Sequence, residues 1–315
     1  MQKKAVWMLP VFILALSAML FGIASQRDAG QAKLVRVNLA SPLVTGSRPE
    51  QTAAQPVIRI VLASITSPQE ARGYYSDLLK YIGGKLAMPV EIIQTKTYAE
   101  ANDLVRAGSA DVAFVCTYAY TLGHDEFGMK LLGIPIINGQ GSYQALIVVR
   151  KTSGIEKFAE LKGKTFAFTD PLSNTGTLYP LFLVKQAGKT PDTFFSRYFY
   201  TYSHDYALRS VADNLADGAS IDSTVWDYLS AVNPDLVANL KIISRSPLYG
   251  MPPVVVRPGL NRDLQDRLQA ILFDMVNDPD GRAILRKLRI DRFGPADDAM
   301  YNSVRELAAA VKSHD

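Results

Sequence analysis

The chain has 315 residues, a formal net charge of +4, 48% hydrophobic and 20% charged residues, and one cysteine. This length predicts about two domains of roughly 150 residues each, and the apolar content excludes a disordered chain. The small charge excludes a strongly basic nucleic-acid-binding surface. One cysteine excludes an intrachain disulfide or a zinc site, and Cys116, in an apolar run, is expected to be a buried thiol.

The N-terminus has the pattern of an export segment. Lys3 and Lys4 precede an apolar run from Ala5 to Ala24, which reaches the ~20 residues needed to span a bilayer. A cleaved signal peptide and an uncleaved anchor over residues 1–25 both fit. Residues 26–56 are polar and aperiodic, as in a flexible tether. In either case we expect the folded body outside the cytoplasm. It is free in the periplasm if the segment is cleaved and tethered to the inner membrane if it is not.

The first part of the folded body alternates short apolar runs with helical patterns. In chain order we predict a strand at Val57–Ala63, a helix at Ser67–Leu86, a strand at Pro89–Ile93, a helix from Thr97 to Gly108 and a strand at Asp111–Cys116. Both helices open with a capping box, and Gly108 ends the second as its C′ residue. Such βαβαβ order indicates a parallel, doubly wound sheet.

The pattern then restarts after a strand at Gln144–Arg150. We predict a short helix capped by Ser153 and Glu156, strands at Lys164–Phe168, Phe195–Tyr200, Ala219–Ile221, Leu240–Ser244 and Pro253–Arg257, and helices at Leu178–Ala187, Asp205–Leu215, Ser223–Ala231, Asp263–Asn277, Pro279–Leu288 and Ala296–Lys312. Two α/β halves with terminal helices predict two lobes around a cleft.

Motifs for common catalytic chemistry are missing. Gly163-Lys-Thr and Gly188-Lys-Thr imitate the end of a phosphate-binding loop but lack its first glycine. The zinc motif HExxH and the nucleophile motif GxSxG do not occur. The three histidines have no metal-ligand spacing. We therefore expect no enzyme, no metal and no cofactor.

One strand-to-helix turn carries several small hydroxylated residues. Ser173, Asn174, Thr175, Gly176 and Thr177 lie where a predicted strand ends and a helix begins. Backbone N–H groups at a helix start point outward together and carry partial positive charge. With side-chain donors they can hold an oxyanion without lysine or arginine. Ordinary helix capping is the alternative interpretation.

Other polar residues follow neighbouring predicted strands. His204 and Asp222 stand at two strand-to-helix junctions, the first as an anion donor and the second as a ligand acceptor, a partner of His204 or a plain helix cap. Ser67, Thr117 and Tyr120 follow the first and third strands. Because ligands of open α/β sheets bind at the carboxyl ends of strands, we expect these loops to face one crevice.

These residues also carry a family resemblance. From Val57 to Phe293 the chain resembles the phosphate, phosphite and phosphonate-binding proteins of ABC importers, the PhnD-like branch of type II periplasmic binding proteins. The motifs are Ser67-Pro68 with Tyr75 and Leu79, Gly108–Phe114, Leu161–Phe168, Asp170–Gly176, Ser203-His204, Ala219–Trp226, and Ser246-Pro247 with Pro253–Arg257.

The resemblance implies two α/β lobes that close like a hinged trap. It places the first lobe at 57–145 and 249–315, the second at 146–248, and the crossings at Gln144–Val149 and Pro253–Arg257. It implies that Ser173–Gly176 binds the phosphorus oxyanion with His204, and that Tyr120 closes over it. Asn174 departs from the family's usual threonine. The apolar stretch Tyr249–Pro253 lacks the acid of members that bind aminoalkyl phosphonates, which favours a small anion.

The expected function is capture of phosphate, phosphite or a small phosphonate, by a monomer, for delivery to an ABC permease in the inner membrane. A membrane-anchored sensor domain that reports to a kinase is the first alternative. An enzyme on the same scaffold is the second, against which the missing nucleophile–base pair argues. No nucleic-acid partner is expected.

Overall fold

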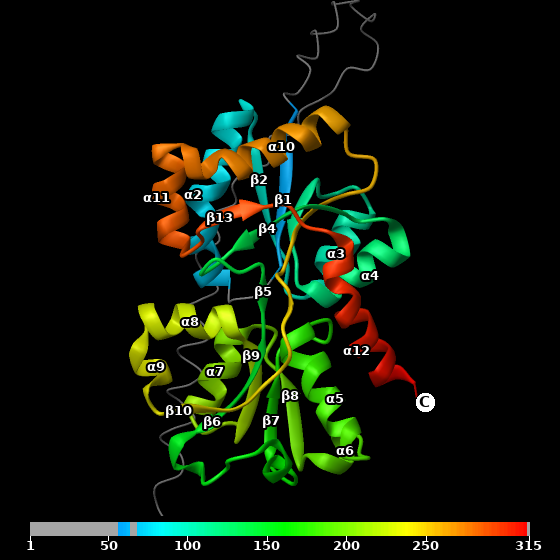
Figure 1. Ribbon diagram of the computed structural model, residues 1–315, viewed down its shortest axis with the longest axis vertical. Helices are drawn as coiled ribbons and strands as arrows, with labels where there is room; N and C mark the ends of the chain where they lie inside the picture. Colours follow the sequence, from blue (N-terminus) through cyan, green and yellow to red (C-terminus); the bar gives the residue numbers. More distant parts are fainter. Residues whose placement is uncertain (1–55, 64–67, 314–315) are drawn as a thin grey trace, which may run out of the picture. The chain divides into compact units, whose positions relative to one another are not determined.

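The structure, a computed structural model, describes residues 56–63 and 68–313, with no side-chain detail for 68–74. The predicted export segment and tether therefore lie outside the described residues, as does Ser67. Two large sheets and one two-stranded ribbon organise the body (Figure 1). We call the six-stranded sheet with its helices the first lobe and the five-stranded sheet with its helices the second lobe.

The first lobe is built on the strand order β13-β4-β12-β3-β1-β2. Its strands are β1 (Ile58–Leu62), β2 (Val90–Gln94), β3 (Val112–Phe114), β4 (Lys130–Ile136), β12 (Val254–Val256) and β13 (Arg292–Gly294). Its helices are α2 (Pro68–Leu86), α3 (Tyr98–Arg106), α4 (Thr117–Phe127), α10 (Arg262–Asp274) and α11 (Pro279–Leu288), with a 3₁₀ turn at Met275–Asn277.

The second lobe is built on the order β10-β6-β9-β7-β8. Its strands are β6 (Ala145–Arg150), β7 (Thr165–Phe168), β8 (Arg197–Tyr200), β9 (Gly218–Asp222) and β10 (Leu240–Arg245). Its helices are α5 (Tyr179–Gln186), α6 (Pro191–Phe194), α7 (His204–Ala212), α8 (Ser223–Val232) and α9 (Pro234–Ala238), with short turns at Lys151–Ser153, Phe158–Leu161 and Asn174–Leu178.

Both sheets combine parallel and antiparallel strands. β2, β1 and β3 are parallel in the first lobe, as are β8, β7 and β9 in the second. In each lobe one antiparallel strand is inserted beside this trio: β12 in the first and β6 in the second. The predicted parallel, doubly wound arrangement is thus correct for the strands that come from βαβ units, and each lobe receives its extra strand from the connection between lobes.

Helices cover both faces of each sheet. In the first lobe one hydrophobic cluster joins α2, α10 and α11 to the sheet, and another lies under α3 and α4. In the second lobe α5 and α6 cover one face, and α7, α8 and α9 cover the other (Figure 1). These layers fix the carboxyl ends of β1, β3, β7 and β9, where polar loops follow.

The crossings between the lobes are not the predicted ones. Gln144–Val149 and Pro253–Arg257 were expected to cross, but β6 and β12 lie inside the two sheets. The segments that cross pair instead as a short antiparallel ribbon of β5 (Ser142–Tyr143) and β11 (Tyr249–Gly250). The apolar residues of the expected crossings belong in the sheets because they are almost completely buried there.

The C-terminal helix also departs from the expected division. α12 (Asn302–Lys312), preceded by a 3₁₀ turn at Asp298–Tyr301, packs against both α4 and α5. Val304, Leu307 and Ala308 join the hydrophobic cluster of the second lobe. Residues 249–315 therefore do not belong to the first lobe alone.

Several elements lacked a sequence signal. β4, β13 and α4 were not predicted, and the stretch around His124, expected to be a loop, lies in α4. The predicted cap at Ser153 is wrong, because Lys157 is the N-cap of the following 3₁₀ turn. The predicted α3 is confirmed, with Thr97 as its N-cap and Gly108 beyond its end at a φ of +69°.

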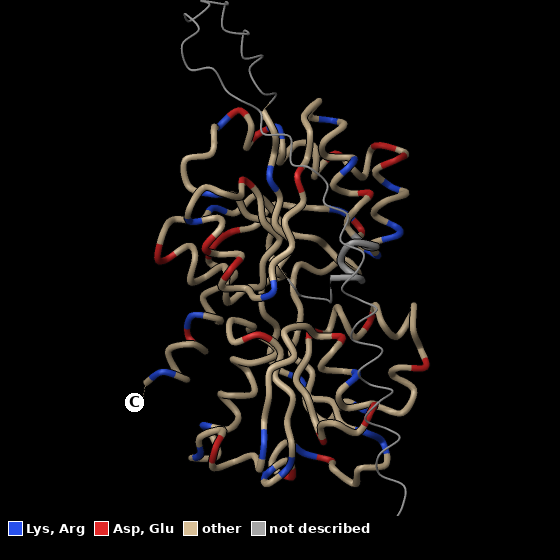
Figure 2. Tube along the Cα trace, turned by 180° about the vertical axis from the view of Figure 1, so that it is seen from behind, with Lys and Arg blue, Asp and Glu red and all other residues tan. Residues whose placement is uncertain are grey.

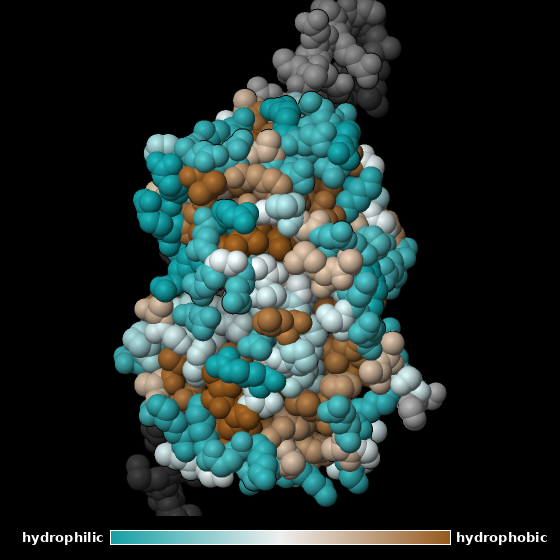
Figure 3. All heavy atoms as spheres, viewed as in Figure 1, coloured by the Kyte–Doolittle hydropathy of each residue, from teal (hydrophilic) through white to brown (hydrophobic). Residues whose placement is uncertain are grey.

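Charged side chains of both signs are spread over the two lobes (Figure 2). Hydrophilic residues cover much of one face, interrupted by separate hydrophobic patches (Figure 3). Among the described residues, Figure 2 shows no lobe in which one sign of charge dominates, in keeping with the small net charge of +4.

Candidate functional site

The predicted polar turn at Ser173–Thr177 is present, and its residues are buried. After β7, Ser173 caps a π-helical turn at Asn174–Leu178, and its Oγ accepts a hydrogen bond from the N–H of Gly176 at 3.0 Å. Every residue from Ser173 to Leu178 is buried. A Cβ on Gly176 would lie 1.8 Å from the Oγ1 of Thr169. The glycine is therefore required by contact within its own lobe, and not, as expected, by the approach of a ligand.

The turn faces the first lobe. The N–H of Asn174 points at the Sγ of Cys116 (3.5 Å), and its Nδ2 donates to the hydroxyl of Tyr143 (3.3 Å). That hydroxyl also lies 2.7 Å from the Oγ1 of Thr117. The structure thus brings the turn, Thr117 and the crossing strand β5 together at the interface between the lobes.

A second contact joins the lobes beside this one. Asp170 precedes the turn, and its Oδ2 accepts a hydrogen bond of 3.0 Å from the N–H of Tyr98 at the start of α3. Its Oδ1 accepts from the N–H of Leu172 at 2.8 Å. Burial raises the pKa of Asp170 above its ordinary value. One carboxylate therefore ties the loop of the second lobe to a helix of the first.

Buried polar atoms without a partner gather at this junction. Among the described residues, the hydroxyls of Tyr98, Thr175 and Thr177 and the Oδ1 of Asn174 are buried and make no hydrogen bond. Leaving such a group unpaired costs about 1–3 kcal/mol, and nearly all buried polar groups are paired. Burial raises the pKa of Tyr98 well above its ordinary value, so its hydroxyl keeps its proton and remains a donor.

His204 and Asp222 lie together at the neighbouring strand end. The N–H of Asp222 donates to the Nδ1 of His204 at 3.1 Å, so the ring carries its proton on Nε2. Burial lowers the pKa of His204 to about 3, which keeps the imidazole neutral. The Oγ of Ser220, two residues before Asp222, donates to the carbonyl of Thr175 at 2.5 Å. β9 is thereby fastened to the turn.

The carboxylate of Asp222 caps a helix. Its Oδ1 accepts from the N–H and the Oγ1 of Thr224 at 2.6 and 2.7 Å, which makes Asp222 the N-cap of α8. Burial raises the pKa of Asp222 to about 6. Its backbone N–H binds His204 and its side chain caps α8. Asp222 thus combines two of its predicted roles, the partner of His204 and the helix cap.

Tyr120 does not reach this site. Its hydroxyl donates to the Oδ1 of Asp298 at 2.8 Å, and its ring packs 4.7 Å from that of Tyr301. The structure does not support the expectation that Tyr120 closes over a ligand, because its ring is buried within the first lobe and its hydroxyl is already bonded to Asp298. The expected role of Ser67 falls outside the described residues.

Tyr98 and Tyr143 were missed from the sequence. Tyr98 directly follows the N-cap Thr97, a position at which any residue fits the capping pattern. Tyr143 lies in a two-residue strand too short for a periodic signal. No metal-binding cluster of three His, Cys, Asp or Glu residues occurs in the described part of the chain.

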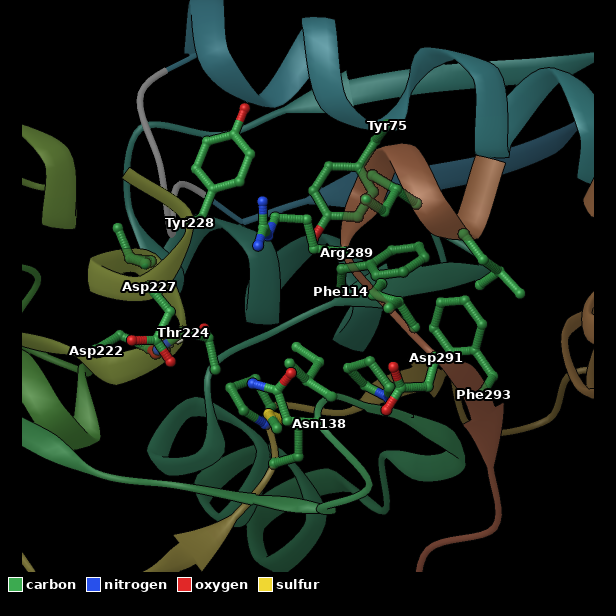
Figure 4. A pocket seen from close by; sticks show the side chains of 18 of the residues that line it. Tyr75, Phe114, Asn138, Asp222, Thr224, Asp227, Tyr228, Arg289, Asp291 and Phe293 are labelled. Carbon is green, nitrogen blue, oxygen red and sulfur yellow. Dashed lines mark hydrogen bonds between the residues drawn. The ribbon is translucent and has the colours of Figure 1, made fainter. Parts of the chain in front are cut away.

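A cavity of about 550 Å³ opens next to Asp222, lined from both lobes. Figure 4 shows Tyr75 and Phe114 from the first lobe and Thr224 and Tyr228 from the second around the same space. Residues of the turn itself do not line it. The site thus has two parts: an enclosed polar junction and, beside Asp222, an open cavity.

Two sheets of this order, joined by crossing strands around an interlobe site, define a two-lobed type II periplasmic binding protein. Residues 60–301 match the family of ABC transporter, phosphonate, periplasmic substrate-binding proteins. Because the match spans most of the chain, the protein belongs to that family. It is a solute-binding protein and not an enzyme.

Individual relatives agree with this assignment. The phosphonates-binding periplasmic protein of Escherichia coli is 24% identical over 78% of this chain and 74% of its own length. The phosphate-import protein PhnD of Mycolicibacterium smegmatis is 25% identical over 76% and 79%. A binding protein component of an ABC phosphonate transporter from Pseudomonas aeruginosa has the same fold, with a TM-score of 0.77, 24% identity and coverage of 82% and 87%.

Proposed function

We propose that the chain captures a phosphorus oxyanion between its lobes, at the turn Ser173–Thr177 together with His204 and Tyr98, for delivery to an ABC permease. The observation that carries the proposal is the group of buried hydroxyls without partners at the junction. A tetrahedral anion accepts several hydrogen bonds at once, so one ligand would relieve the cost of all these groups.

The donors are neutral, which suits a buried anion site. Hydrogen bonds to a charged acceptor are roughly twice as strong as neutral ones, and a desolvated cleft strengthens them further. The neutral ring of His204 adds an Nε2–H donor. The Oδ1 of Asn174 can only accept, which matches a hydroxyl on a protonated phosphate or phosphonate. We expect micromolar or tighter affinity, about −8 kcal/mol.

The relatives favour the same ligand class and the same place in the cell. One is a phosphonates-binding periplasmic protein and another a phosphate-import protein. We infer an extracytoplasmic location and a monomer that meets the permease after closure. The sensor alternative finds no support among these relatives. No helix of the described residues is long and apolar enough to cross a membrane, and Ala5–Ala24 lies outside them.

A thermal-shift panel of phosphate, phosphite, methylphosphonate, aminoethylphosphonate and sulfate tests the proposal. Ligand at ~100 times its Kd stabilises the folded state by about 2.7 kcal/mol, which raises the Tm by about 5–10 °C at ~2–4 °C per kcal/mol. At least one phosphorus oxyanion should produce this shift and sulfate a smaller one. If none of the phosphorus compounds raises the Tm, the proposed function is wrong.

A further inference from the structure

The cavity beside Asp222 is much larger than an inorganic oxyanion needs. Its volume of about 550 Å³ lies within the ~300–1,000 Å³ of pockets that hold drug-sized ligands. It adjoins the oxyanion site, because Asp222 lines it and also holds His204 through its N–H. Ala63 and Val115, just beyond β1 and β3, line it as well, so it lies at the carboxyl ends of the strands.

The walls of the cavity are suited to an organic group. Phe114 and Met251 supply apolar surface, and Tyr75, Thr224 and Tyr228 supply aromatic and hydroxyl groups. Tyr75 comes from α2 of the first lobe and Tyr228 from α8 of the second, and both project into the same space (Figure 4). A group held here would therefore contact both lobes and stabilise their closed arrangement.

The charges around the cavity balance. Three carboxylates and three guanidinium groups line it: Asp222, Asp227, Asp291, Arg282, Arg286 and Arg289. Asp227 and Arg289 approach from opposite lobes (Figure 4). Burial raises the pKa of Asp227, and the positive charges of Arg245 and Arg289 partly oppose that rise. A balanced lining favours a neutral substituent over a second anion or a cation, since neither sign of charge gains a net attraction.

The geometry points to a ligand with a neutral organic substituent: an organophosphonate or phosphate monoester whose aromatic or hydroxylated group fills this cavity while its phosphoryl group binds at Ser173–Thr177. This inference rests on the proposed function and deepens it. It replaces the small anion that the apolar stretch Tyr249–Pro253 favoured, because that stretch contributes Met251, Pro252 and Pro253 to the cavity wall.

Calorimetric titration of the full chain with four probes tests the inference. These are phosphate, methylphosphonate, phenylphosphonate and glucose 6-phosphate. Phenylphosphonate or glucose 6-phosphate should bind at least tenfold more tightly than phosphate. Asp227→Trp places a large ring in the cavity. It should reduce the ratio of the larger probe's affinity to the affinity for phosphate at least tenfold.

Two variants separate bulk from other effects. Ala231→Trp adds the same ring to an exposed position of α8 that does not line the cavity, and the ratio should stay as in the wild type. Asp227→Asn removes the charge without the bulk and should change the ratio less than threefold.

Each outcome has one meaning. If phosphate and methylphosphonate bind and both larger probes bind more weakly than phosphate, the inference is wrong and the proposed function stands. A preference for the larger probes that Asp227→Trp leaves unchanged also overturns it, because the substituent then lies elsewhere. If none of the four probes binds, both the proposed function and the inference are wrong.

Discussion

The two threonines of the anion turn combine high burial with unused hydroxyls, which predicts opposite effects on stability and on binding. Thr175→Val and Thr177→Val each remove a buried hydroxyl that has no partner among the described residues. Stability without ligand should be unchanged or rise by up to about 1 kcal/mol, because an unpaired polar group is lost. Phosphate affinity should fall at least tenfold, which is about 1.4 kcal/mol.

The control is a threonine whose hydroxyl is used. Thr121 is equally buried, and its Oγ1 donates to the carbonyl of Tyr118 at 2.9 Å. Thr121→Val should lower stability by about 1 kcal/mol and leave affinity as it is. Urea unfolding and calorimetry measure both quantities. Turn variants that lose stability but keep their affinity would mean that these hydroxyls serve the fold alone.

His204 and Asp222 predict a compensated pH profile. Their folded pKa values are about 3 and about 6, against ordinary values near 6.5 and 3.9. Between pH 4 and 6 the unfolded chain binds more protons at His204, and the folded chain binds more at Asp222. Lowering the pH therefore destabilises the fold through the histidine and stabilises it through the aspartate.

Removing one partner should expose the other. Relative to wild type, the unfolding free energy of Asp222→Asn should fall as the pH decreases from 6 to 4, by at most about 1.4 kcal/mol per unit. His204→Asn should show the reverse trend, and asparagine can still cap α8 in the first variant. Urea unfolding at several pH values measures the profiles. Profiles parallel to that of the wild type in both variants would contradict the assigned burial.

For single residues, the sequence predicts which chemical groups gather at a junction better than it predicts where each side chain points. The hydroxyl-rich turn and His204 stand out because small polar residues at a strand-to-helix junction are an unusual grouping. Tyr120 fails because it lies one turn into α4, where the helix directs it toward Asp298 and Tyr301. The sequence holds no sign of that orientation, since α4 itself was not predicted.

Among the elements, the link between α3 and the loop after β7 predicts a role for Asp170 in closure. Its carboxylate accepts from the N–H of Tyr98 in one lobe and of Leu172 in the other. Asp170→Ala should therefore shift the lobes toward an open state and weaken phosphate binding about tenfold, because the closed state loses a charge-assisted hydrogen bond worth about 1.5–3 kcal/mol.

Small-angle scattering separates closure from simple damage. At saturating phosphate, Asp170→Ala should retain a larger radius of gyration than wild type. Asp192→Ala is the control, because Asp192 accepts a side-chain hydrogen bond from Tyr198, which lies in the same lobe. If the two variants close alike and bind alike, the bond to Tyr98 has no part in closure.

Elements with end signals were predictable and the others were not. The sequence predicts an N-cap threonine and a terminal glycine for α3, and both are present in the structure, where Thr97 accepts from the N–H of Glu100. The N-cap of α4 is Cys116, whose side chain makes no capping hydrogen bond, so the aromatic first turn of the helix resembles a loop. β4 contains Gly133 and Pro135, residues that break a strand pattern, and was hidden for that reason.

For the whole molecule, the chain order could show two α/β halves but not which strands close each sheet. β6 and β12 both follow a crossing and insert next to the parallel trio. An apolar run looks the same whether it crosses between lobes or lies within a sheet, so the crossings were assigned one segment away from β5 and β11. α12 packs on both lobes. Its amphipathic pattern predicts a buried face but not the lobe against which that face packs.

The distribution of charge predicts weak salt dependence of phosphate binding. Lysines and arginines are dispersed over both lobes (Figure 2), and the residues assigned to the oxyanion are neutral. Capture then depends on burial and hydrogen bonding, which salt screens little, rather than on exposed charge. The Kd for phosphate should change less than threefold between 50 and 500 mM sodium gluconate, whose bulky anion competes poorly for the turn.

A steeper dependence of the Kd on salt would assign the anion to a different site. The arginines of the cavity, Arg282, Arg286 and Arg289, are exposed, and an anion bound to them would lose affinity as salt rises. A tenfold weakening over this range, measured by calorimetry, would therefore place phosphate against the C-terminal part of the first lobe. It would overturn the assignment of the oxyanion to Ser173–Thr177, because that turn offers only hydroxyl, amide and backbone groups.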